Sequence, residues 1–171
     1  MTITGKEKDY KPIVKVNDRN YIISWNKEMI KEEKSSLAGK KSASEPSFSW
    51  EAFRFSHKPT ANEIKEFIHN KINREVSYAI ENYFKWNGYS VKLTKENQSN
   101  YKMYYDLACQ TSGASLPVTV KFYKGKDVEY YTFELLDEFT DFYTKMVAHI
   151  NSCLERGWKK KDLFHIEDYM L

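Results

Sequence analysis

The clearest hydrophobic pattern in the chain is one stripe of apolar residues near its C-terminal end, spaced as on one face of an α-helix. Its members are Phe139, Phe142, Tyr143, Met146, Val147, Ile150, Cys153 and Leu154. Asp137 is a good N-cap before the stripe. Gly157 can adopt the left-handed conformation that ends many helices, and Trp158 can then pack against the last turn. The pattern predicts a buried helix over residues 137–156.

Two further helices are predicted upstream. Thr60 and Glu63 have the spacing of a capping box, in which each side chain accepts a hydrogen bond from the other residue's backbone N–H. Apolar residues then recur at helical spacing, at Ile64, Phe67, Ile68, Ile72, Val76 and Ile80. Thr94 can cap another helix, with apolar positions at Tyr101, Tyr104, Tyr105, Leu107 and Ala108.

Short β-rich runs lie between the helices. Residues 84–91 contain Asn87-Gly88 between aromatic and β-branched residues, and Asn-Gly favours the type I′ turn of a tight hairpin. Pro117 precedes a β-rich run over residues 118–122, and a second run covers 128–135. The intervening Gly125-Lys126-Asp127 favours a turn, so these runs predict another hairpin.

The first residues of the chain follow a different pattern. Residues 1–11 are polar and predict a loose arm. Residues 13–16 and 21–25 are β-rich and flank four turn-forming residues, which predicts a hairpin. Asn26 can then cap a short helix.

Residues 38–47 are small, polar and poor in apolar side chains, so they predict a linker. Residues 48–55 follow as an aromatic strand. Its alternation shifts phase after Trp50, which indicates a bulge or a bend.

Together these elements predict an α+β fold with three main helices and two or three β-hairpins. We expect a C-terminal α+β domain over residues 60–171 and a small N-terminal β-rich module over residues 1–59. The module is small for a unit that must cover its own apolar strands, so we expect it to dock on a partner or to swap between copies. The candidate partner-binding residues are Ile13, Val14, Tyr21, Ile23, Trp25, Phe48, Trp50, Phe53 and Phe55.

Composition narrows the class of protein. The chain has 27 basic and 24 acidic residues, a near balance that argues against a dedicated nucleic-acid binder. Its 13 tyrosines suit protein contacts, although half-buried sheet positions also explain them. Cys109 and Cys153 fall at apolar helix positions and are expected to be buried free thiols. The N-terminus lacks a secretory signal and no stretch is long enough to span a membrane, so we expect a soluble protein made in a cytoplasm.

The search for chemistry yields no predicted catalytic, cofactor-binding or metal-binding residue. The histidines lack metal-site spacing, and no phosphate-binding loop or nucleophile motif is present. Glu138 and Asp141 suit the first turn of a helix, where negative charge is favoured, without a catalytic role. Trp158 with residues 159–161 forms a small basic and aromatic patch that could contact phosphate, although a solvated helix end explains it too.

From about residue 63 to residue 162 the order of features resembles a domain of unknown function found in tail-fibre-associated proteins of bacteriophages, including phages of gut Bacteroidetes and of enterobacteria. The resemblance is carried by the helix over 64–80, the hairpin over 82–93, the strand over 116–122 and the closing helix over 149–158. These motifs are structural, and the family supplies no catalytic residues. Residues 1–59 fall outside the resemblance.

The resemblance implies a non-enzymatic structural protein of the phage virion, associated with the tail or tail fibre and synthesised in the bacterial host cytoplasm. Its partners would be other phage structural proteins, with repeated copies in a symmetric assembly. Two alternatives stay open. One is a tail-fibre assembly chaperone that is missing from the mature particle. The other is a small cytoplasmic enzyme or a nucleic-acid-binding regulator.

Overall fold

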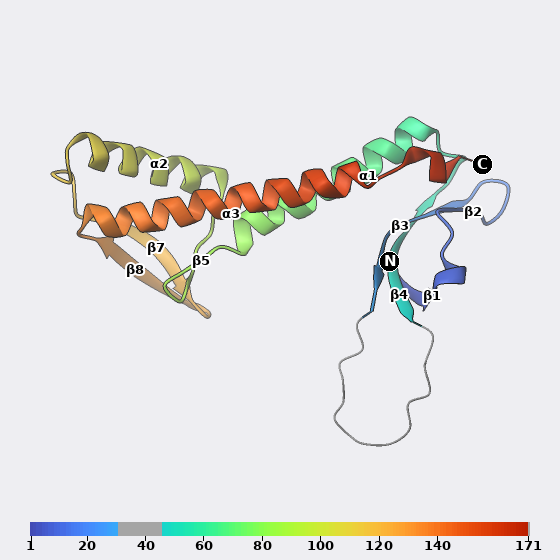
Figure 1. The fold of residues 1–171 in the computed structure, drawn as a ribbon, viewed down its shortest axis with the longest axis horizontal. Helices are drawn as coiled ribbons and strands as arrows, with labels where there is room; N and C mark the ends of the chain where they lie inside the picture. The colour runs from blue at the N-terminus through green and yellow to red at the C-terminus, as the bar shows by residue number, and fades with distance from the viewer. Residues whose placement is uncertain (31–45, 171) are drawn as a thin grey trace, which may run out of the picture. The chain divides into compact units, whose positions relative to one another are not determined.

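A computed structural model describes residues 1–30 and 46–170 (Figure 1). Over these residues the protein is α+β, with three α-helices and two four-stranded antiparallel sheets, which confirms the predicted fold class. The chain forms two compact units. Residues 1–68 and the segment from His165 onward make the first, and His69–Phe164 make the second.

The predicted boundary between the two domains is at residue 60. Residue 60 lies inside the first unit, and a docking module over residues 1–59 stays a prediction. Of the predicted linker, residues 38–45 lie outside the described part of the chain. Ser47 already belongs to a strand.

The first sheet contains the predicted N-terminal hairpin. Strand β2 (Ile13–Lys15) pairs with β3 (Tyr21–Met29), and Ile13 lies opposite Ile23. Strand β4 (Ser47–Phe55) pairs with β3, and the sheet order is β1-β4-β3-β2.

The predicted loose arm is wrong, because its first residues form strand β1 (Thr2–Lys6) on the other edge of β4. A 3₁₀ turn, η1 (Glu7–Asp9), follows β1. Gly5 lets β1 lie close to the Trp50 side chain, since a Cβ at residue 5 would stand 2.8 Å from the Trp50 ring. Backbone pairing along β4 thus orders a segment whose polarity alone suggested a free end.

The short helix predicted after Asn26 is also wrong. Strand β3 continues to Met29, and Asn26 has a positive φ of 56°. The register shifts here, since Trp25 pairs with Glu51 and Glu28 pairs with Ser49, so two residues of β3 face Trp50. The irregularity indicated by the aromatic strand therefore lies in its neighbour β3, where asparagine tolerates the left-handed conformation of a bulge.

The first unit has a core of its own. Its buried residues are Tyr21, Ile23, Trp25, Phe48, Trp50 and Ala52 from the sheet, Ile64 and Ile68 from helix α1, and Tyr169. Phe53 and Phe55 contact the Phe67 ring, with centroid distances of 4.8 and 5.5 Å. The expectation that these strands need a foreign surface is therefore wrong for their buried face, which the same chain covers.

A shared hydrogen-bond acceptor connects the C-terminal segment to the rest of this unit. It forms the short 3₁₀ helix η2 (Ile166–Tyr169). The Tyr169 hydroxyl donates to the Ser24 carbonyl oxygen at 3.0 Å, and the Tyr10 hydroxyl donates to the same oxygen at 3.2 Å. One carbonyl of β3 therefore joins residues from both ends of the chain.

Helix α1 (Ala61–Asn82) begins as predicted and contributes residues to both units. The Thr60 N–H donates to Glu63 Oε2 at 2.7 Å, and the Glu63 N–H donates to Thr60 Oγ1 at 3.3 Å, which confirms the capping box. Helix α2 (Lys95–Gln110) is capped by Thr94, whose Oγ1 accepts from the Asn97 N–H at 3.1 Å.

The second sheet contains both hairpins predicted for this region. Strands β5 (Lys85–Trp86) and β6 (Tyr89–Ser90) flank Asn87 and Gly88, whose φ angles are 46° and 82°. Strands β7 (Val118–Lys124) and β8 (Asp127–Phe133) form the longer hairpin, and the sheet order is β5-β6-β7-β8. Aromatic rings from the sheet, α2 and α3 fill the core beside it, including the fully buried Phe122, Phe133, Phe139 and Phe142.

Helix α3 (Leu136–Asp162) differs from its prediction at both ends. Leu135 is the N-cap, without a side-chain bond, and Asp137 lies in the first turn. The helix continues past Gly157, so the predicted glycine stop and the predicted packing of Trp158 are wrong; Trp158 is exposed. The glycine serves close packing instead, because a Cβ at residue 157 would stand 2.5 Å from Val76 Cγ2 on α1.

Candidate functional site: a basic and aromatic groove on α1 and α3

The nine predicted partner-binding residues do not form one accessible surface. Five of them, Tyr21, Ile23, Trp25, Phe48 and Trp50, are buried in the first unit. Ile13, Phe53 and Phe55 are half-buried, and only Val14 is exposed, at 36%. A partner could not reach the five buried side chains without opening the sheet. Contact through the other four stays a prediction.

The two carboxylates considered for acid–base chemistry have structural partners. Asp141 Oδ2 accepts from Lys145 Nζ at 2.7 Å and from Trp86 Nε1 at 2.9 Å. The hydrogen bonds from Lys145 and then Trp86 lower the pKa of Asp141. Glu138 accepts a hydrogen bond from the Tyr131 hydroxyl, and this bond is the main cause that raises the pKa of Tyr131 to about 12.

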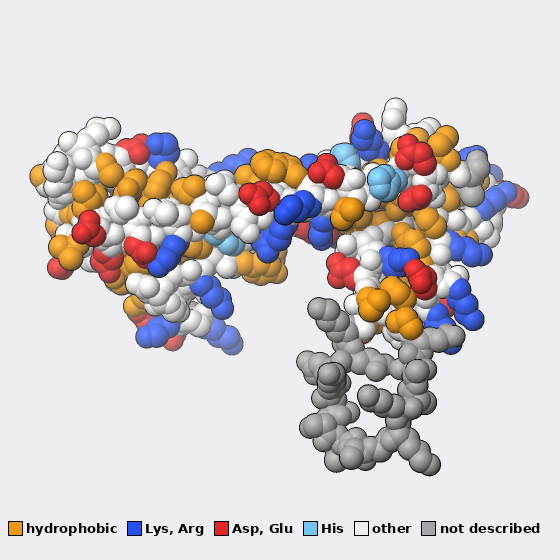
Figure 2. All heavy atoms as spheres, in the orientation of Figure 1, with side chains coloured by type: hydrophobic (Ala, Val, Ile, Leu, Met, Phe, Trp, Pro, Cys, Tyr) orange, Lys and Arg blue, Asp and Glu red, His pale blue; other side chains and the backbone are white. Residues whose placement is uncertain are grey.

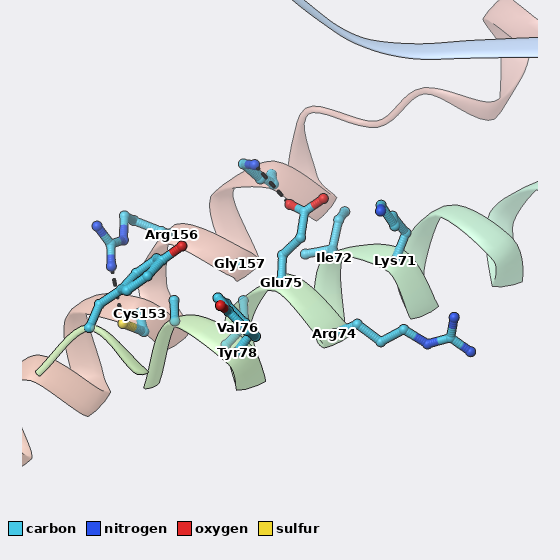
Figure 3. Close-up of a pocket in the computed structure, with 12 residues that line it drawn as sticks. Lys71, Ile72, Arg74, Glu75, Val76, Tyr78, Cys153, Arg156 and Gly157 are labelled. Atoms are coloured by element: carbon cyan, nitrogen blue, oxygen red, sulfur yellow. Dashed lines mark hydrogen bonds and ion pairs between the residues drawn. The ribbon is translucent and has the colours of Figure 1, made fainter. Parts of the chain in front are cut away.

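An open groove of about 580 Å³ lies on the second unit, between α1 and the C-terminal half of α3 (Figure 3). Its lining residues are Lys71, Ile72, Arg74, Glu75, Val76, Tyr78, Ala79 and Tyr83 from α1 and the following turn, and Cys153, Arg156, Gly157 and Lys160 from α3. Gly157 sets its shape, because the missing side chain lets the two helix backbones approach. The groove is therefore a product of the helix crossing.

Charge in the groove is unbalanced. Four basic residues line it, against the single carboxylate of Glu75. Lys160 Nζ pairs with Glu75 Oε2 at 3.1 Å across the two helices, and Figure 3 shows Arg74 pointing away from this pair. In the view of Figure 2, basic and acidic side chains are interspersed over the second unit.

Two exposed tyrosines stand at one end of the groove. The rings of Tyr78 and Tyr83 meet edge to face, with centroids 5.6 Å apart. Their exposed fractions are 59% and 63%, high for large amphipathic side chains. Exposed tyrosines beside basic side chains and an apolar floor are the composition found where proteins bind other proteins.

A thiol with two nitrogen neighbours lies at the base of the groove. Arg156 Nη2 donates to Cys153 Sγ at 3.0 Å, and His149 Nε2 stands 3.8 Å from the same sulfur. His149 Nε2 also lies 3.2 Å from the Ala79 carbonyl oxygen of α1. Cys153 is a buried free thiol as predicted, whereas Cys109 is exposed on α2, contrary to the prediction. His149 therefore links this cluster of α3 to the backbone of α1.

Sequence reasoning missed this groove because it treated each helix alone. The lining residues of α3 are Cys153, Arg156, Gly157 and Lys160, which recur at intervals of three, one and three along one helix face. That spacing was available in the sequence. The interpretation of Gly157 as a helix end hid it, since a stopped helix would not carry Lys160 to Glu75.

Residues 1–30 and 46–170 contain neither a candidate metal site nor a helix suited to cross a membrane. No group of three or more histidine, cysteine, aspartate or glutamate side chains there could hold a metal ion. Among the same residues, no helix is both long and apolar enough to cross a membrane.

No protein-family model matches this chain, and neither a curated protein nor a solved structure does. The resemblance to phage tail-fibre-associated proteins therefore stays a prediction from the sequence.

Proposed function

We propose that this protein is a non-enzymatic structural component of a tailed bacteriophage virion, associated with the tail or tail fibre. It is made in the host cytoplasm and acts by contact with other phage structural proteins. The phage assignment is supported by the resemblance over residues 63–162. The mode of action is supported by one observation, the groove in which Tyr78 and Tyr83 stand beside an apolar floor and four basic side chains.

The groove fits a protein partner for physical reasons. Tyrosine buries a large rigid ring at little entropic cost, and arginine adds directional hydrogen bonds. Val76 and Ala79, which are half-buried on the groove floor, would gain free energy when covered. The excess of basic residues favours a partner surface with acidic side chains.

Mass spectrometry of purified particles tests the phage assignment. We expect the protein in mature virions of the phage that encodes it, in a fixed ratio to known tail proteins. Its presence in infected-cell extracts but not in virions would support the chaperone instead. Its absence from both structural particles and assembly intermediates would contradict both assignments.

Site-specific photo-crosslinking tests the groove. A benzoylphenylalanine at Tyr78 should crosslink to a tail protein within particles, because this side chain is 59% exposed at the groove. Met103 on α2 is a matched control, since it is 56% exposed and lies outside the groove. Equal crosslinking at both positions, or none at Tyr78, would remove the groove as the contact surface.

A nucleic-acid-binding regulator is the second candidate, and the same groove favours it. Exposed tyrosines can stack on bases while lysine and arginine contact phosphates. Fluorescence anisotropy with mixed-sequence single-stranded DNA and RNA at low salt separates the candidates. We expect no binding; saturable binding that weakens on Tyr78→Ala substitution would favour the regulator.

A further inference from the structure

The outer edge of β8 is the surface from which we draw a further inference. Strand β8 is the last in the order β5-β6-β7-β8, and it pairs with β7 without a register shift over all seven residues. No backbone hydrogen bond joins its other edge to a turn or loop in the described part of the chain. An open edge of this length presents a row of free N–H and C=O groups.

The sequence of this edge has only part of the usual protection. Edge strands are commonly blunted by charged residues, proline or a bulge; residues 127–133, DVEYYTF, have no lysine, proline or bulge, and their only charges are Asp127 and Glu129. Val128 and Tyr130 are instead 45% and 74% exposed on the outward face of the sheet. β-Branched and aromatic side chains at such positions favour further strand pairing.

We propose that β8 pairs with β8 of a second copy of this chain, antiparallel and about a two-fold axis through Tyr130. The two sheets then join into one sheet of eight strands. The proposal concerns only this strand and does not depend on the phage assignment.

The register follows from the side chains. If the two-fold axis passes through a residue, the core-facing side chains of both copies lie on the same face of the joined sheet. If the axis passes between two residues, the core-facing side chains of one copy lie on the opposite face. Centring on Glu129 would set two carboxylates opposite each other, which is unfavourable. Centring on Tyr130 pairs all seven residues and places Glu129 opposite Tyr131 and Asp127 opposite Phe133. No like charges then face each other across the axis.

The self-complementary register favours a second copy of this chain as the partner of β8. On the exposed face, Tyr130 meets Tyr130 of the second copy, and Val128 meets Thr132. An aromatic pair at the axis and β-branched pairs on both sides are favourable cross-strand contacts. An isologous pair of this kind closes on itself, so it gives a dimer and not a filament.

Sedimentation equilibrium of the full chain tests the proposal. We expect a concentration-dependent dimer between roughly 10 and 500 µM, the range suited to a small interface. Tyr130→Lys sets two ammonium groups face to face at the axis and should raise the dimer Kd at least about tenfold. Met103→Lys is the matched control, since Met103 is a 56% exposed residue on α2, outside the sheet, and should leave the Kd unchanged.

Charge pairing across the axis gives the sharpest result. Tyr130→Lys and Tyr130→Asp should each be monomeric, and an equimolar mixture should dimerise, because opposite charges then meet at the axis. A wild-type monomer at the highest concentration would overturn the proposal. So would an unaffected Tyr130→Lys dimer, equal loss with Met103→Lys, or a mixture that fails to associate.

A measurement on the unmodified protein covers the case in which a variant does not fold. Amide hydrogen exchange of residues 127–133 should slow by at least about tenfold between dilute and concentrated samples, because the open edge becomes hydrogen-bonded. Residues 118–124 of β7 are the internal reference and should not change. Equal exchange in β8 at both concentrations would overturn the proposal.

Discussion

The two units differ in how far apart in the sequence their contacting residues lie. The first unit joins residues 1–68 to the segment from His165, and the bond from Tyr169 to Ser24 spans 145 residues. The second unit uses the continuous segment His69–Phe164, in which neighbouring hairpins and helices pack on each other. Local contacts close short loops and non-local contacts close long ones, so the two units should differ in order of formation.

Their interiors differ as well. In the second unit the Phe142 ring meets the rings of Phe84, Trp86, Tyr101, Phe122, Phe133 and Phe139, with centroid distances from 5.2 to 6.2 Å. In the first unit the buried Trp25 and Trp50 belong to sheet strands, and one backbone carbonyl accepts two tyrosine hydroxyls. One interior therefore depends on ring packing, and the other adds hydrogen bonds from distant segments.

The largest expected effect tests the aromatic interior. Phe142→Ala should lower the free energy of unfolding by about 3–5 kcal/mol, because it removes a fully buried ring. Native-state hydrogen exchange should show lost protection mainly in residues 69–164. Ile23→Ala, at a fully buried position of the first unit, should cost about 2–5 kcal/mol and act mainly on residues 1–68. Equal loss across the whole chain for both variants would show that the units unfold together.

The next effect concerns the helix crossing. Gly157→Ala should destabilise the protein in urea denaturation, because the new methyl group meets Val76 at 2.5 Å and overpacking of this kind costs about 1–3 kcal/mol. This cost should exceed the roughly 1 kcal/mol that alanine gains over glycine inside a helix. Val76→Ala combined with Gly157→Ala should recover part of the loss. A more stable Gly157→Ala protein would contradict the close approach.

A smaller effect tests the long-range bond of the first unit. Tyr169→Phe removes the hydroxyl that donates to Ser24 and should cost about 0.5–1.5 kcal/mol, the net value of a buried hydrogen bond. Tyr10→Phe should cost less, because Tyr10 is more exposed. A double-mutant cycle measures whether the two hydroxyls are coupled through their shared acceptor. Additive losses would mean that each acts alone.

The smallest effect is nearly absent at neutral pH and is expected only at alkaline pH. Burial raises the pKa of Tyr101 to about 12 from an ordinary value of 10.0. The neutral phenol is thus favoured in the folded protein. Its contribution to stability is full below pH 10 and is lost as the pH rises toward 12. Tyr101→Phe should leave stability at pH 7 nearly unchanged and make the alkaline fall shallower in pH-dependent urea denaturation. If the loss of stability at alkaline pH is the same in Tyr101→Phe, other groups cause that loss.

The sequence predicted the second unit better than the first because more of its elements depend on residues that are close together in the sequence. Capping at Thr94 and the Asn87-Gly88 turn depend on residues within a few positions, so local chemistry indicated them correctly. Strand β1 and the extension of β3 past Asn26 depend on pairing with β4, which local chemistry does not contain.

The candidate groove could not be predicted from the pattern of each helix taken separately. Helical spacing could place Cys153, Arg156 and Lys160 on one face of α3. It could not show that Val76 and Glu75 of α1 face them, because periodicity does not say which helices cross. The five buried aromatic and apolar residues of β3 and β4 were misassigned for a related reason, since the strand pattern did not show what packs on them, such as the Tyr10 ring beside Trp50.

The contact between Gly157 and Val76 also bears on how distant relatives can be recognised. A protein that keeps this helix separation cannot enlarge residue 157 unless it reduces residue 76, so the two positions should vary together in size. A large residue at one should coincide with a small residue at the other. This pairwise rule survives when overall identity has been lost, and it offers a filter for divergent sequences that resemble this chain only in the spacing of their helices.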